Sequence, residues 1–318
     1  MGAFRYPLQR TTPACAKSPE DTVRMISFDK IAIVGRYEAN DLVIDSINHL
    51  YRFLQDLGKD ILLDEKAAEV IKEDGAAGMS YEALGDVADL AIVVGGDGSM
   101  LTAARSFAQH NLPVVGINRG GLGFLTDIAP DEIVAKLGEV FAGHYITESR
   151  FLLSAKQGLI SGEGRCGQAL NDVVLSSGLS GRMIEFELYI DDQFVYSQRS
   201  NGLIVSTPTG STAYALSGGG PIMHPSLDAI VLVPILPHTL TGRPIVVDGN
   251  SRIKIIPGSL HDTSPLVSCD GHSNFSLDPG DELCVSKLRD SLTLIHPLPH
   301  DFYERCRSKL DWGSRLGN

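Results

Sequence analysis

Short apolar runs alternate with amphipathic stretches through the first half of the chain. The predicted strands cover residues 30–35, 61–63, 90–94 and 114–117, and the predicted helices cover 43–57, 99–109 and 131–141. The strands are nearly free of polar residues, which is typical of a parallel sheet buried on both faces. Strands that alternate with helices predict a Rossmann-like parallel α/β domain, where ligands bind beyond the carboxyl ends of the strands.

From about Arg150 the hydrophobic period changes to two, and helical stripes nearly vanish. Residues 183–190 alternate apolar and acidic side chains, a turn is predicted at Asp191-Asp192, and the chain returns through 194–196. Further strands are predicted at 169–176, 202–206, 229–235, 252–256, 266–269, 283–288 and 292–295. This half is therefore predicted to be an antiparallel β-rich, sandwich-like domain.

The two patterns divide the chain into four parts. Residues 1–27 lack periodicity and are predicted to be a flexible extension. Residues 28–148 form the predicted α/β domain, and 149–294 form the β-rich domain. Residues 295–318 recover a weak helical stripe, so we expect this segment to pack back on the α/β domain.

Charge and cysteine content narrow the class of protein. A formal net charge of −12 over 318 residues would repel nucleic-acid phosphates, so we expect no nucleic-acid partner. The five cysteines are scattered and odd in number, which indicates neither a disulfide framework nor a zinc knuckle. No apolar run approaches the ~20 residues that span a bilayer, and no secretion signal is evident. We therefore expect a cytoplasmic protein with reduced thiols and no membrane partner.

The run Gly95-Gly96-Asp97-Gly98 follows a predicted strand and opens a predicted helix. Glycines let backbone N–H groups approach an anion closely, and the helix N-terminus adds partial positive charge, so phosphate is the expected guest. Asp97 would repel phosphate unless it holds a metal ion or accepts a proton from an attacking hydroxyl. The run therefore points to phosphoryl transfer. The alternative is a turn in which Asp97 only caps the helix.

Two further loops have the composition of ligand-binding segments. Residues 116–127 are glycine-rich and carry Arg119, which can offer a cation to phosphate or serve only a local turn. Residues 206–221 consist mainly of Ser, Thr, Gly, Pro and Ala, which cannot build a core. Their hydroxyls suit a ribose, an amide or a phosphate, and Tyr214 can stack on a base.

Polar residues also interrupt the predicted strands of the β-rich half. Asn171-Asp172 supplies an amide that can read a base edge and a carboxylate that can accept two ribose hydroxyls, or it forms a bulge. Arg199 and Asn201 precede the strand at 202–206, where a structural salt bridge is the ordinary alternative. His272 follows a turn signature that also fits a plain hairpin. The nine histidines show no metal-ligand spacing.

Together these stretches resemble the NAD kinases, which phosphorylate the 2′-hydroxyl of the adenosine ribose of NAD. The matching motifs, in family order, are GGDGSML at 95–101, GINRGGLGFLTD at 116–127, NDVVL at 171–175, STPTGSTAY at 206–214, SGGGPI at 217–222 and SCDG at 268–271. GGDG is shared with lipid kinases and phosphofructokinases, whereas STPTGSTAY is much more particular to this family.

The resemblance implies a role for each matching residue. Asp97 matches the general base that takes the proton from the ribose hydroxyl as it attacks the terminal phosphate of ATP. Asn171 and Asp172 match the pair that holds the adenosine end of NAD. Substrate contacts are also implied for Gly98, Arg182, Arg199, Asn201, Thr212, Ala213, Tyr214, Ala215, Leu216, Ser217 and His272. Mg²⁺ would bridge the phosphates of ATP, and a homodimer or homotetramer is expected because family members complete the dinucleotide site across subunits.

Three positions depart from the family pattern. Asp172 stands where the family mostly has Glu, and His272 stands where close relatives carry Gln. Asn201 replaces an Asp that contacts the nicotinamide end of NAD, which removes a charge and adds donors. Our hypothesis is that Asn201 weakens NAD binding or alters the choice between NAD and NADH. The alternatives are a related kinase for a lipid or sugar, and a dinucleotide sensor without phosphate transfer.

Overall fold

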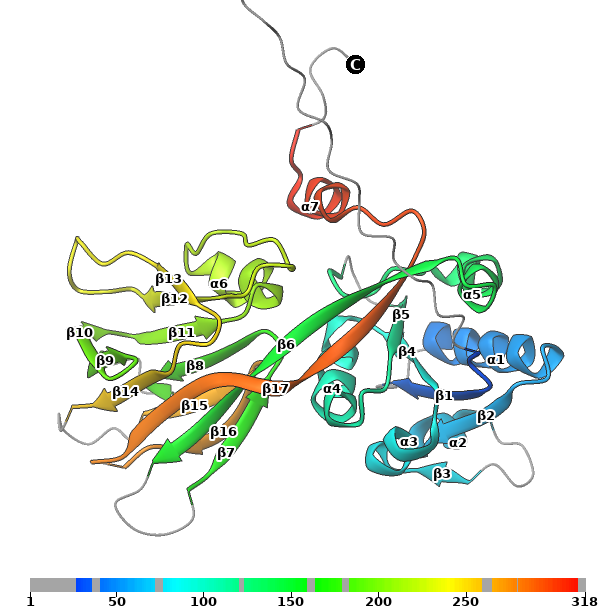
Figure 1. The fold of residues 1–318 in the computed structure, drawn as a ribbon, viewed down its shortest axis with the longest axis horizontal. Helices are drawn as coiled ribbons and strands as arrows, with labels where there is room; N and C mark the ends of the chain where they lie inside the picture. Colours follow the sequence, from blue (N-terminus) through cyan, green and yellow to red (C-terminus); the bar gives the residue numbers. More distant parts are fainter. Residues whose placement is uncertain are drawn as a thin grey trace, which may run out of the picture.

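The computed structural model describes residues 27–35, 41–71, 77–119, 123–158, 164–178, 183–258, 265–278 and 280–313. Residues 1–26 of the extension predicted at 1–27 lie outside these ranges, as does the candidate site residue Arg182. Figure 1 shows an α/β half and a β-rich half, which are joined by the two long strands β6 (Tyr145–Gly158) and β17 (Glu282–Pro297). The predicted fold class is therefore confirmed.

The first half contains a parallel sheet in the order β5-β4-β1-β2-β3. Its strands are β1 (Lys30–Gly35), β2 (Asp60–Asp64), β3 (Gly78–Met79), β4 (Leu90–Gly95) and β5 (Val114–Asn118). Parallel pairing brings the carboxyl ends of β4 and β5 to the same edge, where both predicted glycine-rich loops begin.

Helices cover both faces of this sheet because alternate side chains of each strand point to opposite sides. Ile31 and Ile92 pack toward α1, α2 and α5, whereas Ala32 and Val93 pack toward α3 and α4. The helices are α1 (Asp41–Asp56), α2 (Glu65–Ile71), α3 (Tyr81–Val87), α4 (Asp97–Phe107) and α5 (Ile133–Phe141), with single 3₁₀ turns η1 (Ala108–His110) and η2 (Pro130–Glu132). The sequence did not predict α2 and α3, because seven residues hold too few apolar positions to reveal a period.

The second half is a sandwich of two largely antiparallel layers. One layer has the order β13 (Ile245–Asp248), β12 (Ala229–Ile235), β11 (Gly202–Ser206), β8 (Asp172–Ser176), β15 (Leu266–Cys269) and β16 (His272–Ser276). The facing layer contains β10 (Gln193–Ser200), β9 (Ile184–Ile190), β14 (Ile253–Pro257), β17 (Glu282–Pro297), β6 (Tyr145–Gly158) and β7 (Cys166–Ala169). Phe186 and Leu188 meet Leu203 and Val205 in the core between the layers. The predicted hairpin around Asp191-Asp192 is the β9–β10 pair.

The two halves share one sheet. β17 pairs with β14 and β6 in the β-rich half and, farther along, with β5 in parallel through Leu294 and Val114. The separate strands predicted at 283–288 and 292–295 are one strand, whose pairing with β6 is irregular between Lys287 and Ser291. β6 itself was not predicted, because its first half alternates weakly and is largely exposed.

The strand predicted over 169–176 is two strands instead. β7 ends at Ala169 and β8 begins at Asp172, so Leu170 and Asn171 form a sharp connection between them. The N–H groups of Leu170 and Asn171 donate to the carboxylate of Asp270, about 100 positions later, rather than to a neighbouring strand. Strand propensity cannot detect such a distant partner.

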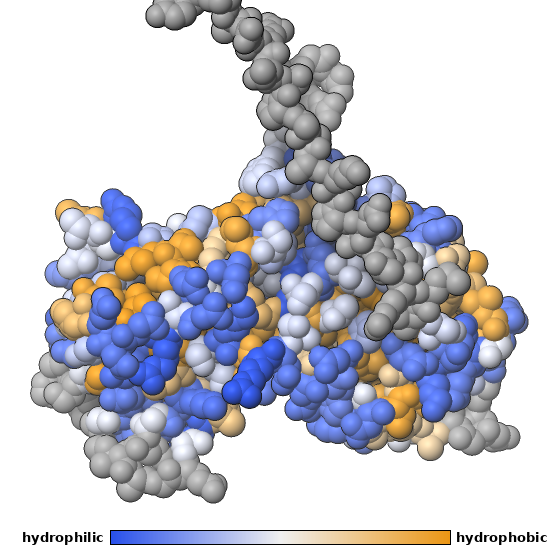
Figure 2. Space-filling model, viewed as in Figure 1, coloured by the Kyte–Doolittle hydropathy of each residue, from blue (hydrophilic) through white to orange (hydrophobic). Residues whose placement is uncertain are grey.

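The remaining helical segments lie after β11 and at the C-terminal end. They are η4 (Thr209–Thr212), α6 (Tyr214–Ser217) and α7 (Phe302–Leu310). Asp301 caps α7 by accepting hydrogen bonds from the N–H groups of Tyr303 and Glu304. In the part of the chain that the structure describes, no helix combines the length and apolarity needed to cross a bilayer. Figure 2 shows a notch between the two halves on the face viewed there.

Candidate active site

Asp97 lies where β4 meets α4, and the following loop holds its carboxylate. Oδ2 accepts a hydrogen bond from the Phe124 N–H at 2.7 Å, and Oδ1 accepts one from the Leu125 N–H at 3.0 Å. A Cβ at Gly123 would lie 2.2 Å from Asp97 Oδ1, so only glycine allows the loop to approach this closely. The carboxylate is half-buried and has a fixed orientation. Gly98 is exposed beside it.

The connection between β7 and β8, which is formed by Leu170 and Asn171 and leads into Asp172, packs against the hydroxyl-rich loop at 206–221. Thr207 donates its hydroxyl to the Leu170 carbonyl at 2.6 Å and its N–H to the Asn171 carbonyl at 2.9 Å. Gly210 fits here because a Cβ would lie 2.2 Å from the Asn171 carbonyl oxygen. The serine and threonine side chains thus replace a strand partner for the connection. Asn171 and the loop therefore form one surface.

The start of α6 presents most of the other predicted site residues. Thr212 and Ala213 are half-buried, Tyr214 is 47% exposed, and Ser217 is exposed. Ala215 and Leu216 complete the short helix, with Ala215 buried under it. A crevice lined by Phe124, Leu125, Thr209 and Thr212 joins this segment to the loop that holds Asp97. The fold therefore brings the three predicted segments together, although each comes from a different part of the sequence.

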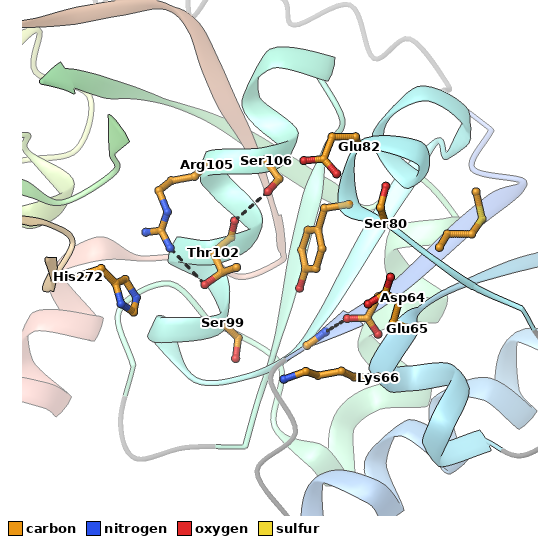
Figure 3. A pocket seen from close by; sticks show the side chains of 13 residues that line it. Asp64, Glu65, Lys66, Ser80, Glu82, Ser99, Thr102, Arg105, Ser106 and His272 are labelled. Atoms are coloured by element: carbon orange, nitrogen blue, oxygen red, sulfur yellow. Dashed lines mark hydrogen bonds between the residues drawn. The ribbon is translucent and has the colours of Figure 1, made fainter. Parts of the chain in front are cut away.

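A larger cavity of about 580 Å³ opens beside the first turns of α4. Asp64 and Lys66 line it from the α/β half, and His272 lines it from the start of β16 (Figure 3). Asp64 accepts hydrogen bonds from the N–H groups of Gly35 and Ala67, and burial raises its pKa to about 6. The volume is that of a small-molecule or cofactor site.

Asp172 is the most perturbed carboxyl among the predicted site residues. Its side chain is 4% exposed. Burial, with the neighbouring Asp270 carboxylate, raises its pKa from 3.8 to about 7. A buried carboxyl of raised pKa next to a second carboxylate is a recurrent feature of functional sites.

Arg199 and Asn201 are not part of this assembly. Arg199 belongs to β10 and Asn201 joins β10 to β11, so both lie beyond the end of β11 opposite to Ser206. Five residues of strand span about 17 Å. The Asn201 N–H donates to the Ile235 carbonyl, and the Arg199 carbonyl accepts from the His238 N–H. Both residues therefore adjoin the segment after β12, where Leu236 and Leu240 are 69% and 93% exposed.

Comparisons with known proteins agree with this architecture. A family model of the ATP-NAD kinase N-terminal domain matches residues 31–145, and one of the ATP-NAD kinase C-terminal domain matches 170–297. The NAD kinases of Pseudomonas fluorescens Pf0-1 and Pseudomonas syringae pv. tomato DC3000 are 57% and 58% identical over 293 and 296 residues, which is 92% of this chain and 99% of each relative.

Both halves of the chain, and nearly its whole length, thus match one family. The chain belongs to the ATP-NAD kinase family. Among solved structures, yeast NADH kinase complexed with NADH superimposes with a TM-score of 0.84 at 24% identity, covering 95% of both chains. An Archaeoglobus fulgidus NAD kinase in complex with ATP gives 0.68 at 24% identity, covering 89% of this chain and 97% of its own. These two likenesses concern the fold.

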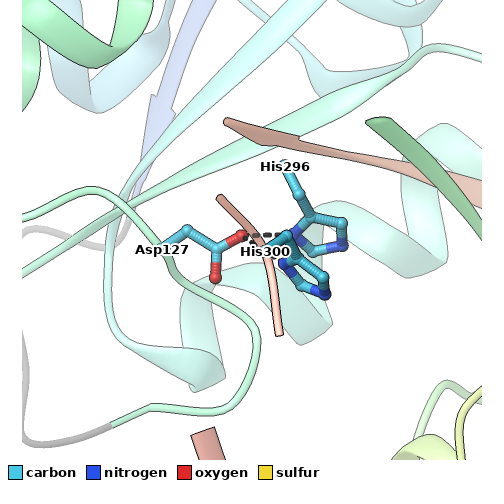
Figure 4. A group of neighbouring side chains, drawn as sticks. All are labelled: Asp127, His296 and His300. Atoms are coloured by element: carbon cyan, nitrogen blue, oxygen red, sulfur yellow. Dashed lines mark hydrogen bonds and ion pairs between the residues drawn. The ribbon is translucent and has the colours of Figure 1, made fainter. Parts of the chain in front are cut away.

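A charged cluster, drawn in Figure 4, includes Asp127, two residues after the Leu125 that donates its N–H to Asp97. Asp127, His296 and His300 place ligand atoms within 4.8 Å of one another. Arg305 pairs with Asp127, and both histidines also face Glu148. Burial alone would raise the pKa of Asp127, but the histidines and Arg305 hold it well below its ordinary value. Sequence spacing could not reveal this cluster, because Asp127 and His296 are 169 positions apart.

This cluster does not fit Mg²⁺. Two of its three possible ligand groups are imidazoles, whereas Mg²⁺ prefers oxygen ligands, and a guanidinium already neutralises the carboxylate. Its contacts instead connect the C-terminal segment to the active-site loop. Arg305 of α7 donates to the Phe124 carbonyl at 2.8 Å, next to the amide that holds Asp97.

Lys309 of α7 is a site neighbour that sequence reasoning missed. Its ammonium lies 4.8 Å from the centre of the Phe124 ring, and the side chain is half-buried. Burial lowers its pKa to about 8, and the charge of Asp97 opposes that effect. The only signal in the sequence was the weak helical stripe of the last residues, which gives no indication of what the helix contacts.

Proposed function

We propose that this NAD kinase transfers the terminal phosphate of ATP to the 2′-hydroxyl of the adenosine ribose of NAD, with Asp97 as the general base. The assignment of the base rests on one observation. The N–H groups of Phe124 and Leu125 donate hydrogen bonds to the Asp97 carboxylate and fix its orientation. An ionised carboxylate has about four lone-pair directions, so two remain for a hydroxyl proton. A base fixed before substrate binds loses no orientation entropy on the way to the transition state.

The two substrates then occupy neighbouring spaces. The adenosine end of NAD lies against Asn171, Asp172 and the loop carrying Thr212 and Tyr214, which offers hydroxyls, an amide and an exposed ring. ATP occupies the cavity beside α4, where Lys66 supplies a cation and the helix N-terminus favours phosphate. Mg²⁺ would enter bound to ATP rather than at a dedicated protein site, and it would neutralise charge that develops on the phosphates during transfer.

Arg199 and Asn201 act in a second copy of the chain under this proposal. They are too far along β11 to reach the site of their own chain, but they adjoin the exposed Leu236 and Leu240. Exposed apolar residues of this size favour a protein interface. We therefore infer a homodimer or homotetramer, measurable by analytical ultracentrifugation. A cytoplasmic location accords with the free cysteines 166, 269, 284 and 306.

The deciding experiment incubates the protein with NAD, ATP and Mg²⁺ and couples any NADP to an NADP-specific dehydrogenase. Asp97→Asn should lower kcat by ~10²-fold or more, because general-base catalysis typically contributes that much. Asp131→Asn is the matched control, since Asp131 is an exposed acid on η2. An Asp97→Asn enzyme with at least a tenth of wild-type kcat would remove Asp97 from the role of base.

The same assay separates the alternatives. ATP consumption with a diacylglycerol or a sugar phosphate but not with NAD would favour the related kinases, and tight NAD binding without NADP formation would favour a sensor. The hypothesis on Asn201 is tested by Asn201→Asp. Equal Michaelis constants for NAD and for NADH in the two proteins would contradict it.

A further inference from the structure

Asp270 has a buried carboxylate that joins the two halves of the molecule. It lies in the turn between β15 and β16, in the left-handed conformation with φ of 51°, and its side chain has no exposed surface. Oδ2 accepts a hydrogen bond from Arg105 Nη1 at 2.7 Å. Arg105 belongs to α4, 165 positions earlier in the chain.

The same carboxylate accepts hydrogen bonds from three consecutive backbone N–H groups. Those of Leu170, Asn171 and Asp172 lie at 3.1, 2.8 and 3.4 Å from its oxygens. The Asp270 N–H in turn donates to the Asp172 carbonyl at 3.0 Å. Thr207 holds the carbonyls of the same connection from the other side. The backbone of this connection is therefore fixed on both sides: Asp270 accepts from its N–H groups, and Thr207 donates to its carbonyls.

Arg105 connects Asp270 to the helix α4, which begins with Asp97. It lies eight residues after Asp97 on the same helix, which is about 12 Å along the axis. A shift of Asp270 would therefore change where the Asn171-Asp172 pair sits relative to the helix that begins with Asp97. Misplacement of reacting groups by about 1 Å can cost ~10²-fold in rate.

We propose that Asp270 is a positioning residue for phosphate transfer, which sets the distance between the adenosine-binding connection at Asn171-Asp172 and the helix carrying Asp97. The inference rests on the proposed role of Asn171 and Asp172 in holding NAD. The Asp270 side chain has no exposed surface with which to contact either substrate. Its effect passes through the hydrogen bonds that it accepts from three backbone N–H groups and from Arg105.

The test uses full-length Asp270→Asn, with Asp281→Asn as the matched control. Asp281 is also buried in the β-rich half, where it accepts hydrogen bonds from Gln157 Nε2 and the Asp278 N–H. Asp270→Asn replaces an acceptor oxygen by a donor facing N–H groups. We expect its KM for NAD to rise at least ~10-fold, equivalent to about 1.4 kcal/mol of binding, while its KM for ATP changes less than about 2-fold. Asp281→Asn should lower the melting temperature without separating the two constants.

Arg105→Lys provides a second test if Asp270→Asn does not fold. The ammonium retains the charge but loses the planar fork, so we expect a smaller rise in the KM for NAD in the same direction. A folded Asp270→Asn or Arg105→Lys enzyme with an unchanged KM for NAD would overturn the proposal. For Asp270→Asn, equal changes in both Michaelis constants would do so too, since these indicate a merely structural role. Arg105→Lys is compared by its KM for NAD alone, because Arg105 also lines the cavity assigned to ATP. If Asn171→Ala leaves the KM for NAD unchanged, the proposed role of Asn171 fails instead, and with it the premise.

Discussion

The substitution Asp172→Asn should stabilise the protein above neutral pH. Because the pKa of Asp172 is raised from 3.8 to about 7, the folded chain keeps a proton that the unfolded chain releases in this interval. The free energy of unfolding therefore falls as the pH rises from 3.8 to about 7. One pKa unit is worth about 1.4 kcal/mol, so the ionised Asp172 costs the folded state up to ~4 kcal/mol above pH 7. An uncharged amide avoids this cost.

The assay is urea unfolding of wild type and Asp172→Asn at pH 5.5 and pH 8. The difference in unfolding free energy should move by ~2 kcal/mol in favour of the variant between these conditions, because about half of the interval lies above pH 5.5. Taking the difference at each pH cancels other titrating groups that both proteins share. A difference that is the same at both pH values would refute the reasoning. The variant should also bind NAD more weakly, because it loses the carboxylate that we propose holds the adenosine end of NAD.

Two further predictions concern the loop and the cluster behind it. Gly123→Ala would place a methyl group 2.2 Å from Asp97 Oδ1, so we expect kcat in the coupled assay to fall at least ~10-fold. Gly138→Ala, which meets nothing within 4 Å, should leave kcat unchanged, and equal rates for both variants would contradict the argument. For His300, burial alone would lower the pKa, but Asp127 and Glu148 raise it. Its contribution to stability is thus present below about pH 6.5 and lost as pH rises through the folded value. The melting temperature of His300→Gln should fall less than that of wild type between pH 6 and pH 9, and parallel curves would count against this account.

The sequence by itself determined the elements and the chemistry of their ends. The runs before Gly95 and Asn118 could only be buried strands, and the period of two after Arg150 could only form sheets, because one buried face imposes that spacing. Asp97, Asn171 and the hydroxyl-rich loop were identifiable because each combines residue types that a hydrophobic core does not use. The family resemblance was visible for the same reason, since its motifs are these polar interruptions.

Tertiary structure alone decided which of these polar groups act together. Three sets of contacts join residues far apart in sequence. The N–H groups of Phe124 and Leu125 donate to Asp97, the connection at Asn171 donates to Asp270, and Arg305 of α7 donates to the Phe124 carbonyl. Burial, which raises the pKa of Asp172, is a property of the packed halves and not of the residues themselves. Local patterns carry no information about such partners, because a carboxylate accepts hydrogen bonds equally well from any N–H group that the fold brings to it.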